Sequence, residues 1–135
     1  MNARGFVMME ILVALLVVAV AVTAALALAL DGLRSTTEAR RAQVAGALAA
    51  DIAGRVRALP GVAWHALPPP AGCVAACTPE QLAAEELAQW QSAAGGLLPD
   101  GIGLLEPADD GELVARVAWT DTGGSRRELL LGIGQ

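Results

Sequence analysis

The chain has no lysine and no tyrosine, one phenylalanine, one histidine and two cysteines. All nine cationic side chains are therefore arginines, set against fourteen acidic residues, and the formal net charge is -5. A surface that binds nucleic acid needs clustered lysine and arginine to neutralise phosphates, so this balance argues against nucleic acid as a partner. Because aromatic residues make up only 3% of the chain, the core has to be built from aliphatic side chains, alanine and tryptophan.

Residues of the types that perform catalysis or bind metals are scarce. His65 is isolated in a proline-rich segment, and no acid, base and nucleophile converge in the sequence, so we expect neither an enzyme nor a cofactor. Cys73, Cys77 and His65 together fall short of the four ligands of a structural zinc site. Asp109-Asp110 fits turn chemistry, and two adjacent acids are a weak signal for calcium. We therefore expect no metal site.

The sequence does contain an uncharged apolar run from Ile11 to Leu30, directly preceded by Glu10. About 20 residues at roughly 1.5 Å each form a helix that matches the ~30 Å hydrocarbon core of a bilayer. Arg4 lies before the run, so we expect the short N-terminal arm in the cytoplasm and the residues beyond about Asp31 in the periplasm. The run predicts a protein that crosses the inner membrane once.

Two plainer interpretations of this run stay open. A secretory signal peptide would also start with a basic residue such as Arg4, and it would find small residues for cleavage at Ala27 and Ala29. A simple membrane anchor needs nothing more than the apolar length. Neither accounts for Glu10, because an acidic side chain near the bilayer centre costs roughly 2.5 to 3.5 kcal/mol and should rarely be left in a targeting segment by drift.

The residues around Glu10 resemble the processing site of type IV prepilins and pseudopilins. The segment has the form Gly5-Phe6-x-x-x-Glu10 and continues as Ile-Leu-Val-Ala-Leu. The resemblance implies that a prepilin peptidase cuts between Gly5 and Phe6 and methylates the new amine of Phe6. It also implies that Glu10 forms an assembly salt bridge with the amine of a neighbouring subunit. Val7-Met8-Met9 departs from the commoner Thr/Ser-Leu-Ile/Leu of the family but keeps its apolar character.

By this resemblance the chain has three parts: a leader peptide (1–5), a transmembrane and assembly helix (6–30) and a periplasmic globular domain (31–135). The globular domain includes the second half of the same helix. Apolar residues recur there at spacings of four and three until Pro60-Gly61 ends the pattern. This stripe consists of Val44, Leu48, Ile52, Val56 and Leu59. We expect one helix from near Phe6 to Leu59, with bending or partial melting near Asp31 and Gly32.

A second helix is predicted after an irregular connector. Thr78 caps it, Gln81 completes a Thr-x-x-Gln capping box, and Gly95-Gly96 ends it. Its apolar face consists of Ala83, Leu87, Trp90 and Ala94. A lone tryptophan on such a face is far more often part of the core than a platform for a ligand, so we expect Trp90 in the core.

Beyond Gly101 the apolar period changes from helical to two. Three strands are predicted, at 102–106, 113–120 and 127–133, and they form an antiparallel meander with one face toward the long helix. Arg126, Arg127 and Glu128 are expected to be solvated edge charges. The predicted fold class is α+β, in which a long N-terminal helix packs on a small antiparallel sheet and a short second helix lies in the connector.

Cys73 and Cys77 lie in the connector, separated by three residues. In an oxidising periplasm such a pair most simply forms a disulfide that closes a short ring. Redox catalysis is a poorer fit, because it commonly uses a Cys-x-x-Cys pair in an electropositive setting. We predict a structural disulfide between the two cysteines.

This order of elements is similar to the pilin fold, and within pilins the chain looks most like the PilV-type minor pilins, also called type IV pilus modification proteins. Besides the processing site, two features carry the likeness: the loop between Cys73 and Cys77, and the segment Ala84-Glu85-Glu86-Leu87-Ala88-Gln89-Trp90 leading to Leu98-Pro99-Asp100-Gly101. No proline interrupts the apolar run, which favours a minor component over the bulk filament subunit.

The resemblance implies a minor pilin that helps to start and assemble type IV pili and so supports adhesion and twitching motility. Its partners would be other minor pilins, the major pilin, the prepilin peptidase, the inner membrane and the pilus assembly platform. The protein would lie in the inner membrane before assembly and in the extracellular pilus afterwards. Two alternatives stay open: a minor pseudopilin of type II secretion, and a single-pass, membrane-anchored periplasmic binding module.

Overall fold

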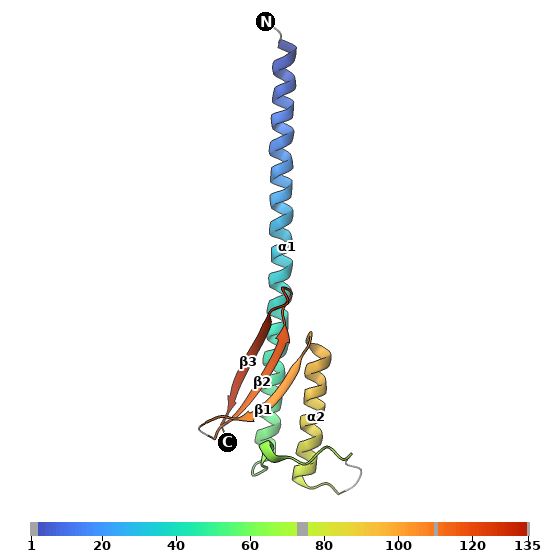
Figure 1. Cartoon of the computed structure of the whole chain (residues 1–135), viewed down its shortest axis with the longest axis vertical. Coiled ribbons are helices and arrows are strands. Elements are labelled where there is room, and N and C mark those ends of the chain that lie inside the picture. The colour runs from blue at the N-terminus through green and yellow to red at the C-terminus, as the bar shows by residue number, and fades with distance from the viewer. Residues whose placement is uncertain (1–2, 73–75, 110, 135) are drawn as a thin grey trace. The chain divides into compact units, whose positions relative to one another are not determined.

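The computed structural model describes residues 3–72, 76–109 and 111–134, with the backbone alone for residues 3–7. The elements follow the predicted order (Figure 1). They are α1 (Ala3–Ala58), a 3-10 turn η1 (Trp64–Ala66), α2 (Pro79–Leu97), β1 (Ile102–Pro107), β2 (Leu113–Thr120) and β3 (Arg126–Ile133). The α+β fold class with a pilin-like order of elements is confirmed. The chain divides into two compact units, Met1–Thr37 and Glu38–Gln135.

Helix α1 runs without a break through Asp31 and Gly32, so the expected partial melting there is wrong, while the expected bending stays a prediction. A glycine inside a helix costs only about 1 kcal/mol relative to alanine, and Leu30, Leu33 and Arg34 nearby are good helix formers. The hydroxyl of Thr36 also donates to the carbonyl oxygen of Gly32 at 2.8 Å, and that of Thr37 donates to the carbonyl oxygen of Leu33 at 2.9 Å. These bonds keep the polar groups around the glycine satisfied within the helix.

The part of α1 that belongs to the second unit has the predicted buried stripe. Leu48, Ile52 and Val56 are buried, and Val44 and Leu59 at the two ends are partly buried. Alanines beside the stripe are buried as well, namely Ala45, Ala49 and Ala53. Because alanine has so small a side chain, the helix surface stays flat here and larger side chains from the sheet can pack closely on it.

The sheet has the order β1-β2-β3, and both pairings are antiparallel. Each strand lies within one residue of its predicted bounds. The predicted inner face of β2 is confirmed, since Leu113, Ala115, Val117 and Trp119 are all buried in the core. Ile133 of β3 is fully buried with them. The hydrophobic core of the second unit therefore lies between this face and the two helices.

The predicted N-terminal cap of α2 is confirmed. The hydroxyl of Thr78 accepts a bond from the backbone N–H of Gln81 at 3.3 Å, and the side-chain oxygen of Gln81 accepts one from the N–H of Thr78 at 3.0 Å. The predicted end at Gly95-Gly96 is wrong, because α2 continues to Leu97. The N–H of Leu98 donates to the carbonyl oxygen of Ala94, and the buried Leu98 side chain anchors this last turn in the core. Two glycines cost the helix about 2 kcal/mol, which such tertiary packing offsets.

Trp90 lies at the junction of three elements, as a core residue. Its side chain is 1% exposed, and its indole N–H donates to the carbonyl oxygen of Leu48 in α1 at 2.8 Å. On the other side it packs against Gly103 of β1 so closely that a Cβ there would lie 2.6 Å from the ring. Gly103 therefore makes room for the indole. The predicted core role of Trp90 is confirmed.

Candidate assembly helix and the contacts of the second unit

The first unit consists of the N-terminal part of α1, and its apolar side chains are exposed. From Met8 to Leu30 the large hydrophobic side chains are between 52% and 75% exposed. In the described residues, α1 is the one helix long and apolar enough to cross a membrane, with a mean hydropathy of 3.0 in its most apolar window. Soluble monomers seldom expose an apolar surface of this extent, so lipid or other protein helices have to cover it. The structure thus supports a membrane-spanning anchor.

Glu10 is the only ionisable residue between Met8 and Leu30. Its side chain is exposed, and it makes no ion pair or hydrogen bond with any residue that the structure describes. Gly5 and Phe6 belong to α1 by their backbone. Helix geometry places positions 6 and 10 on one side of α1, one turn apart and about 6 Å along its axis. The cleavage, methylation and salt bridge inferred for these residues stay predictions.

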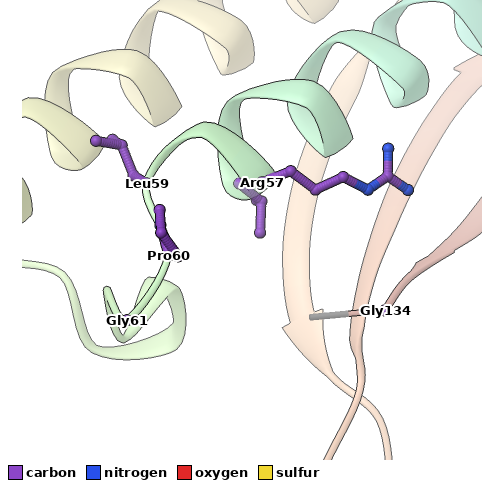
Figure 2. Close-up of a pocket in the computed structure, with 6 residues that line it drawn as sticks. Arg57, Leu59, Pro60, Gly61 and Gly134 are labelled. Carbon is purple, nitrogen blue, oxygen red and sulfur yellow. The ribbon is translucent and has the colours of Figure 1, made fainter.

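The second unit has a pocket of about 460 Å³ where α1 ends (Figure 2). It is lined by Val56, Arg57, Leu59, Pro60, Gly61 and Gly134. The lining is mostly apolar, and Arg57 is the one ionisable residue among the described residues that form it. A guanidinium stays protonated at neutral pH and serves neither as general base nor as nucleophile. The pocket therefore offers space and one positive charge but no set of catalytic groups.

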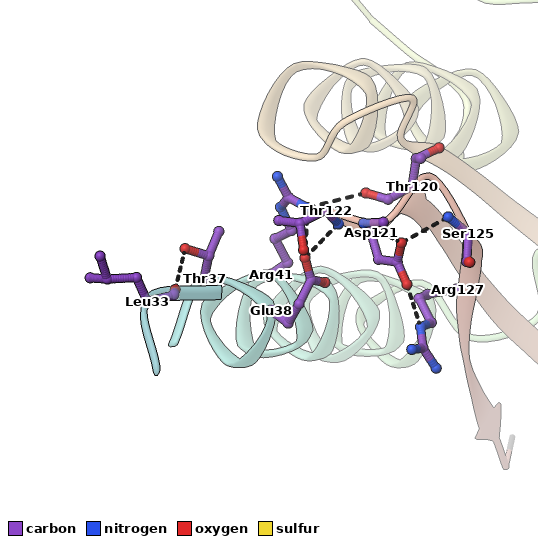
Figure 3. Close-up of polar contacts among 10 residues, drawn as sticks. Leu33, Thr37, Glu38, Arg41, Thr120, Asp121, Thr122, Ser125 and Arg127 are labelled. Carbon is purple, nitrogen blue, oxygen red and sulfur yellow. Dashed lines mark hydrogen bonds and ion pairs between the residues drawn. The ribbon is translucent and has the colours of Figure 1, made fainter. Parts of the chain in front are cut away.

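A polar cluster joins α1 to the turn between β2 and β3 (Figure 3). The carboxylate of Glu38 accepts a bond from the backbone N–H of Thr122 at 2.7 Å and another from the guanidinium of Arg41 at 2.8 Å. The same guanidinium reaches the carbonyl oxygen of Thr120 at 3.4 Å. The bond from Thr122 thereby holds the turn against Glu38, which lies 84 residues earlier in the chain. Sequence reasoning missed this cluster because a single charge on a helix does not reveal which distant backbone group it will meet.

Asp121 organises the turn itself. One carboxylate oxygen accepts bonds from the N–H groups of Ser125 at 2.8 Å and Gly123 at 2.9 Å, and the other accepts a bond from the guanidinium of Arg127 at 3.1 Å. The bond from Ser125 is the largest cause that holds the pKa of Asp121 below its ordinary value, and Arg127 and Gly123 add to it. An aspartate followed by Thr-Gly-Gly-Ser is a recognised turn sequence, so this turn was open to sequence reasoning.

The charges from Arg126 to Glu128 are exposed, as expected, but they also have partners. Arg126 donates to the carbonyl oxygen of Asp100, Arg127 binds Asp121, and Glu128 pairs with Arg116 of β2 at 3.2 Å. They are thus solvated charges, as expected, that also form exposed ion pairs and hydrogen bonds. Alternate residues on neighbouring strands lie close enough for such pairs, and the strand register decides which ones form.

A further ion-pair cluster joins the two helices of the second unit. Arg55 pairs with Asp51 one turn earlier in α1, at 2.9 Å, and with Glu86 of α2. All three side chains are partly exposed, so we assign this cluster to helix–helix positioning.

The remaining sequence candidates offer no chemistry in the described part of the chain. His65 is exposed on η1. Among residues 3–72, 76–109 and 111–134, no three His, Cys, Asp or Glu side chains are grouped so that they could hold a metal ion. Cys73 and Asp110 lie outside the described residues, so the predicted pairing of Cys73 with Cys77 stays a prediction.

Comparison of the chain with protein-family models, curated proteins and solved structures gives no match.

Proposed function

We propose that this chain is a minor pilin that takes part in the initiation and assembly of type IV pili and thereby supports adhesion and twitching motility. The observation that carries the proposal is the exposed apolar part of α1, with Glu10 as its only ionisable residue. A lipid bilayer alone would be better matched by an apolar residue at that position. A helix that is covered by lipid at one stage and by other helices at another accounts for both the exposed surface and the carboxylate.

Processing at the Gly5-Phe6 bond supplies the partner of Glu10 in this proposal. A prepilin peptidase removes residues 1–5, and the new amine of Phe6 is methylated and keeps its positive charge. Glu10 of one subunit then pairs with this amine on a neighbouring subunit as the helix leaves the membrane. At about 4 Å and an effective dielectric constant near 20, such a pair contributes about 4 kcal/mol before the desolvation of the two charges is subtracted. The pair sets the register of subunits, and apolar contacts along the helices supply the cohesion.

The continuity of α1 suits this role. Its residues 3–37 form the first unit, while its residues from Glu38 onward contribute the buried stripe of the second. The same helix thus carries the exposed apolar surface of the first unit and part of the core of the second. We infer that other minor pilins, the major pilin and the assembly platform act on the chain through this helix.

The mature N-terminus tests the proposal most directly. Mass spectrometry of the protein purified from its own membranes is expected to show a chain that begins at Phe6 and carries one methyl group on its amine. The variant Gly5→Leu should stay uncut, because the residue before the scissile bond is changed, whereas Ala3→Leu two residues away should be processed as usual. A wild-type chain that keeps Met1, or one that is trimmed beyond Ala27, would contradict the proposal.

A deletion strain distinguishes pili from secretion. Loss of the gene should reduce surface pili and twitching motility, and type II secretion should continue at the wild-type level. A selective loss of secretion would instead assign the chain to the pseudopilins, which share the processing site. Unchanged pili and unchanged secretion would leave only a membrane-anchored binding module.

A further inference from the structure

The sheet has two edges, and the edge formed by β1 is closed. Along an antiparallel pair, residues whose backbone groups bond the neighbouring strand alternate with residues whose groups point away from it. The N–H of Ala108 bonds the carbonyl oxygen of Glu112, which fixes this alternation for β1 and β2. The positions of β1 that point away from β2 are therefore Gly103, Leu105 and Pro107.

These outward groups of β1 are already bonded, missing or covered. The carbonyl oxygen of Gly103 accepts a bond from the side-chain amide of Gln91 in α2 at 3.3 Å, and Pro107 has no N–H to donate. Both α2 and η1 contact β1. The sheet therefore cannot be extended at this edge without displacing α2.

The opposite edge, formed by β3, is open. The N–H of Asp121 bonds the carbonyl oxygen of Ser125, which fixes the alternation for β2 and β3. The outward positions of β3 are Arg126, Glu128, Leu130 and Gly132. All four residues are exposed, and their backbone groups make no hydrogen bond outside the sheet with any residue that the structure describes. Figure 1 shows β3 on the side of the sheet away from α2.

The second half of β3 also lacks the features that usually protect an edge strand. Proteins protect such strands with proline, lysine, a bulge or a covering element. From Leu129 to Ile133 the chain has no proline and no charge, and its pairing with β2 runs without a bulge. The charged residues 126–128 protect only the beginning of the strand. The rest is a regular template for another strand.

We propose that β3 is the docking site for an extended segment of another protein, which adds an antiparallel fourth strand to the three-stranded sheet. Outward N–H and C=O groups that recur at every second residue are matched only by an extended backbone, so the hydrogen-bonding groups themselves select a strand. The side chains refine the choice. Leu130 offers aliphatic contact, and the guanidinium of Arg126 bonds the carbonyl oxygen of Asp100 but no carboxylate of the described residues. The partner segment therefore carries a β-branched residue opposite Leu130 and an acidic residue opposite Arg126.

A second copy of this chain is a poor occupant. β3 runs in the same direction as α1, because Glu38 binds Thr122 before the strand, whereas Val56 and Gly134 meet around the pocket beyond its end. Antiparallel pairing of two β3 strands would therefore set their α1 helices in opposite directions. Two copies that cross one membrane with their N-termini on the same side carry α1 in the same direction. The inference thus uses the membrane anchor, and it does not depend on assembly into pili.

Peptide binding tests the proposal with the full chain in phosphatidylcholine nanodiscs, and empty nanodiscs give the background. The probe is a fluorescent seven-residue peptide of alternating valine and threonine that ends in glutamate. Fluorescence anisotropy should show binding. The same peptide methylated on the amide nitrogens that would face β3 should not bind, whereas methylation of the amides that would face away should leave the Kd unchanged. Aliphatic contact without strand pairing would not separate the two methylated peptides.

A proline variant of β3 tests the same site from the side of the protein. Leu130→Pro removes an outward N–H and breaks no bond to β2, and proline is tolerated at such edge positions. We expect it to raise the Kd about ten-fold, because one hydrogen bond and the partner's alignment are lost. Leu130→Thr removes the same leucine but keeps the N–H, and it should change the Kd less than about three-fold.

Hydrogen exchange resolved to single amides decides even if the proline variant fails to fold by circular dichroism. In the free protein the amides of Glu128, Leu130 and Gly132 should exchange fast, while those of Leu129 and Leu131 are protected by β2. Bound peptide should slow the three outward amides about ten-fold. Outward amides that are already protected without peptide would overturn the proposal, and protection that grows with protein concentration would assign the edge to a second copy instead. Equal binding of the two methylated peptides would overturn it as well.

Discussion

The indole N–H of Trp90 donates to the backbone carbonyl oxygen of Leu48, 42 residues earlier in the chain, at 2.8 Å. This bond joins α2 to α1 inside the core, where a lost hydrogen bond is not replaced by water. We expect Trp90→Phe to lower the free energy of unfolding by about 2 kcal/mol, from the lost bond and the smaller ring. Urea unfolding followed by far-UV circular dichroism measures it.

Trp64→Phe is the matched control for that substitution. Trp64 is buried to the same degree, but its indole N–H has no hydrogen-bond partner in the described structure. The change therefore removes similar volume without breaking a bond, and it should cost less than Trp90→Phe. Equal losses for the two variants would show that packing alone, and not the bond to Leu48, accounts for the effect.

Gly103→Ala should destabilise the second unit, because the new Cβ would lie 2.6 Å from the ring of Trp90. Overpacking of this kind typically costs 1–3 kcal/mol, or about 2 kcal/mol here. Gly54→Ala is the counterpart, since nothing lies within 4 Å of a Cβ at that helical position. It should stabilise the protein by about 0.5–1 kcal/mol. The same urea titration compares both variants with wild type, and a neutral Gly103→Ala would mean that the indole can shift without cost.

Asp121 should make the stability of the second unit depend on pH under acidic conditions. Its pKa is lowered in the folded protein from an ordinary value of 3.8, first by the bond from the N–H of Ser125. The carboxylate therefore contributes its full stabilisation above that value, and the contribution is lost as the pH falls through the lower folded pKa. Asp121→Asn should flatten the fall in the denaturation midpoint below about pH 4, measured between pH 2 and pH 7.

Asp109→Asn serves as the comparison for Asp121→Asn, because Asp109 is exposed and makes no hydrogen bond or ion pair in the described structure. That variant should follow the wild-type acid profile. If both asparagine variants alter the profile equally, the turn around Asp121 is not the source of the pH dependence.

Glu10→Gln should leave the chain inserted in the membrane and reduce its recovery in sheared pili, because glutamine keeps the size of the side chain but carries no charge to pair with an amine. Membrane fractionation and immunoblotting of sheared filaments report the two steps separately. Glu38→Gln, in the second unit, is the control for loss of a carboxylate from the same helix and should enter pili. Wild-type amounts of Glu10→Gln in the filaments would exclude the pairing role.

The regular elements were predictable because each has its own period along the sequence. Val44 to Leu59 repeats with the helical period, and 113–120 alternates with the strand period, so the buried faces of α1 and β2 followed directly. Thr78 and Gln81 predicted the start of α2 by their spacing, and this too was confirmed. The end of α2 was not predictable from Gly95-Gly96, because the burial of Leu98 overrides the local preference of the glycines.

The candidate functional residues were also predictable only in part. Glu10 stood out in the sequence because a charge beside a long apolar run has a high cost, and the structure places it exposed on α1. The contacts of Glu38 with Thr122 and of Trp90 with Leu48 could not be read from the sequence. Each joins a side chain to a backbone group, and every residue offers similar backbone groups, so composition does not single out the partner.

The cluster of Glu38, Arg41 and Thr122 has a practical consequence for making a water-soluble fragment. A fragment that starts at Glu38 removes the exposed apolar part of α1. It keeps the hydrogen bonds from Glu38 and Arg41 that hold the β2–β3 hairpin on the helix. A fragment that starts at Ala42 would look equally complete by its apolar stripe, yet it would leave the backbone N–H of Thr122 without its acceptor. Four residues at the point of truncation thus separate a fragment with an anchored hairpin from one with a loose hairpin.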